Sequence, residues 1–203
     1  MMSRTAAAVA VALALCSSLP ALAEGSNLDT TGEGAYNARP FVVGDQTVGI
    51  NVGAQIPLFA LGGDSLSMNM YSGAGFGFTY QYFVAPGLAI GGTVEGSFNQ
   101  TYGARNLFIL PLTFRTAYWW TVKAFELGVI AEPGLYLLRL DGKGIVSPIL
   151  KAGAVADWRV SNAWSVGVQA MYWFWPEIHT GDYADLTRYG NFLQTGILAT
   201  YHL

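Results

Sequence analysis

The residues that could do chemistry are few, and the densest group is a polar segment near the end of the chain. Glu177, His179, Asp182 and Asp185 lie close together there. They could bind a divalent cation, or His179 could act as a general base beside a loop carboxylate. The commoner meaning of such a segment is a solvated polar loop. We favour that interpretation and predict no metal site.

The sequence holds no motif of a known catalytic or cofactor-binding kind. It has no cysteine pair, no zinc-type spacing of histidines, no phosphate-binding glycine loop and no Gly-x-Ser-x-Gly segment. We therefore predict no catalytic residue, no cofactor and no enzymatic activity. His202 is expected at a wet rim of the fold rather than in a ligand set.

The segments that must position the remaining polar residues alternate between apolar and polar side chains with a period of two residues. Between Gln46 and Ile56 the even positions hold Val, Ile or Ala, and the odd positions hold Thr, Gly, Asn or Gln. This is the period of a β-strand with two unlike faces. The apolar face suits lipid, whereas the other face carries too little charge for an ordinary water-exposed surface. The pattern therefore predicts a transmembrane β-barrel.

Eight such segments follow one another, and each has the 9–11 residues that a tilted strand needs to cross the hydrocarbon. Short and longer connections alternate, as in barrels with short periplasmic turns. We predict an all-β fold, an eight-stranded antiparallel up-and-down transmembrane β-barrel over residues 46–203. The expected strands are 46–56, 68–83, 88–101, 106–120, 125–140, 145–160, 164–175 and 189–203.

The first residues have the features of a secretory signal. A positive residue precedes an apolar run, and Ala21-Leu22-Ala23 fits the cleavage rule, so residues 1–23 are predicted to be a cleaved signal peptide. Cys16 would allow lipoprotein processing instead, but the preceding Leu15 stands where that processing requires a small residue. Residues 24–45 are polar and irregular, and we predict a flexible periplasmic segment.

The composition indicates the compartment. The chain is 52% hydrophobic and only 11% charged, against about 25% charged residues in soluble domains. The net charge of −3 becomes −4 once Arg4 of the signal is removed, which argues against nucleic acid. An exported, apolar, glycine-rich chain of low charge is typical of the bacterial outer membrane, and we predict that location.

The charges within the expected strands sort by parity. Seven of the eight lie on the inward parity, and only Arg139 is outward, near the outer end of its strand. A lipid-facing Arg or Lys at the bilayer centre costs about 2–4 kcal/mol, which explains the sorting. The predicted lumen network at mid-height consists of Glu95, Arg115, Glu132 and Lys151. The predicted charges at the periplasmic mouth are Glu126, Asp157 and Arg159.

An eight-stranded barrel is wide enough only to be filled by side chains, so we predict a filled lumen with paired charges. The network could simply be the core of the barrel, or it could act as a gate that opens when the ion pairs exchange partners. Both interpretations remain open at this point.

Toward the outer end, the inward positions of the later strands become apolar. We interpret them as a water-exposed collar with its own small core, or alternatively as a vestibule for a small apolar molecule. The inward apolar residues are Leu107, Ile109, Tyr136, Leu138, Ile145, Ile149, Met171, Trp173, Trp175 and Phe192. The candidate ligand contacts among them are Tyr136, Leu138, Met171, Trp173, Trp175 and Phe192.

Aromatic residues on the outward parity gather at one rim. Tyr and Trp prefer the boundary between membrane and water, so we predict a girdle at the periplasmic edge of the lipid. Its members are Tyr80, Tyr82, Tyr118, Trp120, Phe125, Trp158, Trp164 and Tyr201.

With these features, residues 46–203 resemble the small outer-membrane barrels of the OmpA and OmpX type, with OmpW-like and PagP-like barrels related in architecture. The last strand resembles theirs in its alternating Leu193, Ile197, Ala199 and Tyr201, although Leu203 replaces the usual terminal Phe. The resemblance implies that the barrel-assembly machinery and periplasmic chaperones handle the chain during biogenesis. It further implies outer-membrane lipids as the surroundings of a monomer.

Several functions remain open. The first is a non-enzymatic barrel with a side-chain-filled lumen, serving in envelope structure or surface interaction. The second, implied by the OmpW resemblance, is a narrow channel or carrier for small hydrophobic molecules through the outer vestibule. The third is a lipid-modifying enzyme of PagP type that uses His179. The fourth is a soluble lipocalin-like carrier, which the inward charges disfavour.

Overall fold

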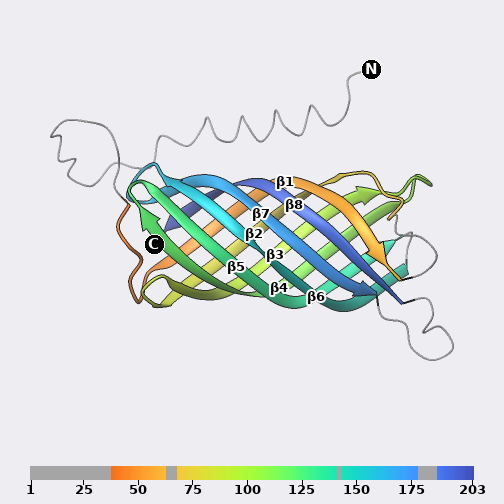
Figure 1. Ribbon diagram of the computed structural model, residues 1–203, viewed down its shortest axis with the longest axis horizontal. Coiled ribbons are helices and arrows are strands. Elements are labelled where there is room, and N and C mark those ends of the chain that lie inside the picture. Colours follow the sequence, from red (N-terminus) through yellow and green to blue (C-terminus); the bar gives the residue numbers. More distant parts are fainter. Residues whose placement is uncertain (1–37, 63–67, 141–142, 178–186) are drawn as a thin grey trace, which may run out of the picture. The chain divides into compact units, whose positions relative to one another are not determined.

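The computed structural model describes residues 38–62, 68–140, 143–177 and 187–203. Eight antiparallel strands form a closed barrel in which each strand pairs with its neighbour in sequence and the last pairs with the first (Figure 1). This confirms the predicted fold class. The strands are β1 (Gln46–Leu61), β2 (Gly73–Ala85), β3 (Leu88–Gln100), β4 (Asn106–Val122), β5 (Phe125–Leu140), β6 (Lys143–Arg159), β7 (Trp164–Glu177) and β8 (Arg188–His202).

The barrel is apolar outside and polar inside, as the alternation predicts. On β2, Phe76 and Phe78 are each 50% exposed, whereas Thr79 and Gln81, which have the opposite parity, are buried. A soluble lipocalin-like barrel has the opposite arrangement, with its apolar parity inside. The outward apolar face therefore excludes that alternative.

The turns at the end with the C-terminus are tight. Gly87 and Lys123 occupy the left-handed region, with φ of 72° and 56°. Glycine adopts this conformation without steric cost, whereas Lys123 does so with strain. Short turns mark the periplasmic end of outer-membrane barrels, so we call this end the periplasmic mouth.

Two strand boundaries differ from the prediction by five residues, and all the others agree to within two. β1 continues past Ile56 to Leu61, with a shift in register between Pro57 and Phe59. Proline cannot donate a ladder hydrogen bond, and such an irregularity is where a strand tolerates it. β2 begins at Gly73 rather than residue 68, because only Met70 pairs before it, in an isolated bridge.

None of the described residues forms a helix long and apolar enough to cross a membrane. The predicted signal peptide lies outside the described residues, as do residues 24–37. The loop residues His179, Asp182 and Asp185 also lie outside them, so the loop chemistry considered for this segment stays a prediction.

Candidate functional site

The four residues of the predicted lumen network meet inside the barrel. The Lys151 ammonium contacts the carboxylates of both Glu95 and Glu132, and Arg115 Nη1 donates to Glu132 Oε1 at 2.7 Å. Lys151 and Glu132 are direct register partners on β6 and β5. Arg115, the most exposed of the four, is only 4% exposed. Two carboxylates and two cations thus balance in the buried interior of the barrel.

Neutral side chains complete the coordination of this network. Thr93 Oγ1 and Thr113 Oγ1 donate to the two oxygens of Glu132 at 3.1 and 3.2 Å. Arg115 Nε donates to Gln81 Oε1 at 3.3 Å. Burying an ion pair is favourable only when further hydrogen bonds satisfy the remaining atoms, and these contacts supply them. The network therefore spans the middle of the lumen with its charges paired.

The predicted mouth charges lie together one layer closer to the periplasm. Arg159 Nη2 pairs with Glu126 Oε1 at 2.7 Å, and Ser165 Oγ donates to Glu126 Oε2 at 2.8 Å. Asp157 is fully buried and accepts from Thr200 Oγ1 at 3.1 Å. The Asp157 carboxylate forms no ion pair with any residue in the described part of the chain. Only two of the three predicted charges are thus paired with each other.

A segment before β1 crosses the mouth and inserts Phe41 into it. We call residues 38–45 the strap. Phe41 is 5% exposed, and its ring stacks on Phe83 with centroids 4.2 Å apart. The Gly87 amide donates to the Phe41 carbonyl at 3.3 Å, and the Gly44 amide donates to the Phe83 carbonyl at 2.9 Å. The strap is therefore fixed by both packing and backbone hydrogen bonds.

The strap belongs to the segment for which we predicted a flexible, irregular conformation. The sequence shows no sign of these ordered contacts. Phe41 is a single apolar residue in a short polar stretch, so no alternating pattern marks it as buried. His202, predicted at a wet rim, packs beside Phe41 with ring centroids 5.8 Å apart. Its Nε2 lies 2.8 Å from Ser165 Oγ.

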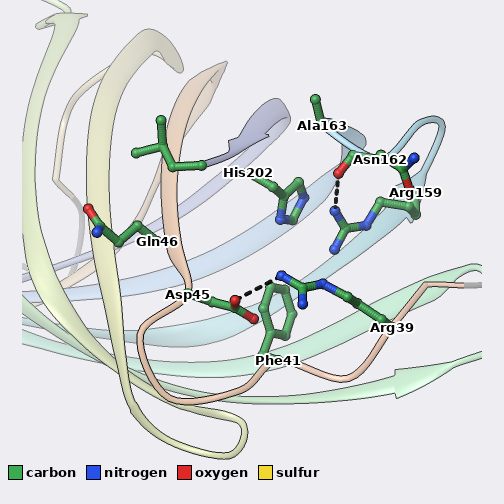
Figure 2. A pocket seen from close by; sticks show the side chains of 9 residues that line it. Arg39, Phe41, Asp45, Gln46, Arg159, Asn162, Ala163 and His202 are labelled. Atoms are coloured by element: carbon green, nitrogen blue, oxygen red, sulfur yellow. Dashed lines mark hydrogen bonds and ion pairs between the residues drawn. The ribbon is translucent and has the colours of Figure 1, made fainter. Parts of the chain in front are cut away.

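A pocket of about 370 Å³ remains between the strap and the ends of β6 and β8. Figure 2 shows Arg39 and Asp45 of the strap facing each other, and Arg39 Nη2 donates to Asp45 Oδ1 at 2.8 Å. Arg159 lies on the opposite wall and donates to the Asn162 carbonyl at 3.0 Å. Both arginines that line this pocket already pair with a carboxylate, Arg39 with Asp45 and Arg159 with Glu126.

The candidate contacts for an apolar ligand form a packed layer above the lumen network. Tyr136, Trp173 and Phe192 have no exposed surface. The Trp175 ring lies 5.3 Å from Tyr136 and 5.4 Å from Phe192. Leu138, Met171 and the other predicted inward apolar residues are also buried, except for the half-buried Ile145. These residues therefore form a core of their own, consistent with the predicted collar.

A small pocket opens above this layer at the outer end. Its volume is about 110 Å³, and its apolar lining includes Met68, Met70 and Trp175. Pockets that enclose drug-sized ligands usually measure about 300–1,000 Å³. The space is therefore below the usual size for such a ligand. The predicted vestibule for a small apolar molecule therefore stays a prediction.

All eight predicted girdle residues lie on the outside of the barrel near the periplasmic mouth. Seven are exposed, from 37% for Tyr201 to 53% for Trp158, and Trp164 is half-buried. Tyr80 Oη donates to Gln46 Oε1 at 2.8 Å. The outward position of these rings at one rim is what a membrane boundary favours, since Tyr and Trp combine an apolar ring with a polar atom.

A second, partial aromatic girdle, which we did not predict, lies near the outer end on β3, β4, β7 and β8. Phe98 and Phe108 contact each other there, with centroids 4.7 Å apart, and Phe174 stacks on Tyr189 at 5.9 Å. Phe108 lies ten residues before Tyr118 on β4, which corresponds to about 26 Å along the axis of a tilted barrel. The apolar band of an outer-membrane barrel is about 25 Å tall. Same-parity aromatic residues at this spacing were the signal that could have revealed the girdle.

Comparisons with known proteins agree with this geometry. A protein-family model matches residues 28–201. The neisserial surface protein A structure has a TM-score of 0.57 at 9% identity, covering 77% of this chain and 96% of that one. The outer membrane protein OprG from Pseudomonas aeruginosa has a TM-score of 0.54 at 11% identity, covering 83% and 98%. No curated protein matches the chain in sequence.

The fold, the filled polar lumen and the two girdles define a class of membrane protein. The chain has the fold of the small eight-stranded outer-membrane β-barrel proteins, as its resemblance to them predicted. Its apolar exterior and this fold place it in the bacterial outer membrane, which confirms the predicted location. Among residues 38–62, 68–140, 143–177 and 187–203, no group of side chains is arranged to hold a metal ion.

Proposed function

We propose that this protein is a non-enzymatic outer-membrane barrel with a closed lumen, acting in envelope structure or surface interaction. The observation that supports this is that three buried layers follow one another along the axis of the barrel. Phe41 fills the periplasmic mouth, Lys151 and its partners cross the middle, and Trp173 with Phe192 fills the outer part. A solute would have to displace an aromatic layer and a charge-paired layer to pass.

Lipids and biogenesis factors are the partners that this proposal requires. Between the two girdles, the outward side chains of the described strands are uncharged, so lipid can surround the whole barrel and a monomer needs no protein partner there. The last strand carries the alternating outward residues Ile197, Ala199 and Tyr201 for recognition by the barrel-assembly machinery.

Liposome swelling tests the closed lumen. Vesicles that contain the purified full chain should swell in small sugars at the rate of protein-free vesicles, while vesicles with a large general porin should swell rapidly. Single-channel recording across a planar bilayer should likewise show no steps. Rapid swelling or regular conductance steps would contradict the closed lumen.

The second candidate is a carrier for small hydrophobic molecules, for which the outer pocket beside Trp175 offers an apolar wall of Met68 and Met70 alongside the polar Asn69, Glu177 and Arg188. Its volume of about 110 Å³ limits any occupant to a few heavy atoms. A short brominated alkane tests it, because bromine quenches tryptophan fluorescence on contact. Saturable quenching in the wild type that disappears in Trp175→Phe would support the carrier; quenching without saturation would support the closed barrel.

A further inference from the structure

Arg139 is the one charged side chain that the described strands direct outward at the level of the outer girdle. Its register partner on β4 is Phe108, a member of that girdle. Arg139 is exposed and forms no ion pair with any residue that the structure describes. This height corresponds to the headgroup region, where a cation meets lipid phosphates.

An apolar groove lies directly beside this guanidinium. It has a volume of about 350 Å³ and runs over β4, β5 and β6. Phe108, Leu110, Leu137 and Val146 contribute its apolar walls, and Arg139 stands at its edge. Figure 1 shows these three strands side by side toward the end opposite the C-terminus.

A glycine keeps the groove open. Gly144 is the register partner of Arg139 on β6. A Cβ atom at Gly144 would meet only the Leu138 carbonyl oxygen, at 3.8 Å, so a side chain would fit there without strain. The absence of one leaves room next to the guanidinium on its β6 side, while Phe108 bounds the other side.

We propose that this groove binds a phosphorylated lipid of the outer leaflet. Arg139 donates hydrogen bonds to a headgroup phosphate, and an acyl chain lies along Leu137, Val146 and Leu110. An arginine suits this role because its planar guanidinium binds phosphate through two parallel N–H groups. The site requires both parts, the charge at the headgroup level and the apolar groove beneath it.

The probe is bisphosphorylated lipid A, added to the purified full chain and measured by native mass spectrometry. Phosphatidylethanolamine serves as the lipid of zero net charge. Arg139→Gln should weaken lipid A binding about tenfold, since a charged hydrogen bond is lost. Gly144→Leu should weaken it to a similar degree by filling the groove. Arg139→Lys should retain more binding than Arg139→Gln.

Arg188→Gln is the matched control, because it removes an exposed cation from the same end on a distant strand, β8. It should leave lipid A binding within twofold of the wild type. Equal losses in Arg188→Gln and Arg139→Gln would show a general basic rim and overturn the proposal. Unchanged binding in Arg139→Gln would overturn it too, as would equal loss in Arg139→Lys.

Two further measurements separate a lipid site from simpler explanations. Inorganic phosphate at the concentration of lipid A should not compete, because it lacks the acyl chain; full competition would mean an anion site without lipid specificity. Wild-type binding of phosphatidylethanolamine as tight as that of lipid A would also overturn the proposal. Heat-modifiable migration on gels confirms that each variant is folded before binding is compared.

Discussion

Replacing Lys151 with methionine tests whether charge pairing holds the lumen together. Lys151 contacts both Glu95 and Glu132, while Arg115 pairs with Glu132 alone. In Lys151→Met, Glu95 therefore keeps a buried carboxylate without a cation. Removing one partner of a buried pair costs about 3–5 kcal/mol, because the remaining charge stays desolvated. We expect the free energy of unfolding to fall by that amount.

The assay is urea unfolding in lipid vesicles, followed by tryptophan fluorescence and heat-modifiable migration. A second variant, Glu95→Gln with Lys151→Met, restores neutrality, because Glu132 still pairs with Arg115. It should recover at least half of the loss. Arg105→Gln is the control for removing an exposed cation and should change stability by no more than about 0.5 kcal/mol.

Two results would refute the reasoning behind this prediction. The first is a loss below about 1 kcal/mol in Lys151→Met, which would mean that Glu95 reaches water or another cation. The second is a double variant no more stable than the single one. In that case the loss would come from packing around the Lys151 stem rather than from the unpaired charge.

Three other predictions concern the strap, the glycines and the outer layer. Phe41→Ala should speed hydrogen exchange at the strap amides about 10–100-fold by mass spectrometry, whereas the exposed Val43→Ala should not. Gly153→Ala should lower the urea midpoint, because its Cβ would lie 2.1 Å from a backbone oxygen; Gly92→Ala, with 3.7 Å of clearance, should not. Trp175→Ala should enlarge the outer pocket yet leave liposome swelling at the protein-free rate, since the charge network below still closes the lumen.

Strand alternation was enough to predict the closed barrel and which residues point inward. The parity of Glu95, Arg115, Glu132 and Lys151 alone put all four in the lumen, because a charge on the lipid face costs several kcal/mol. That these charges pair was also predicted, but which of them contact each other was not. Contact across a barrel depends on register and on which long side chains reach the same point, and only the structure shows Lys151 between two carboxylates.

The strap shows where local patterns fail. Phe41 comes from a short polar stretch without periodicity, and its burial depends on Phe83, Trp119 and His202, which lie on three separate strands. The continuation of β1 through Pro57 is similar, because β8 pairs with those residues and overrides the local tendency of proline to end a strand.

The sequence by itself determined the class of protein, the face that meets lipid and the heights of the charges along the strands. These follow from a two-residue period and from the cost of placing charge in hydrocarbon, which act on each strand separately. The tertiary structure alone decided the ion-pair partners, the strap across the periplasmic mouth, the packed outer layer and the groove beside Arg139. Each of these depends on side chains that converge from strands far apart in the chain.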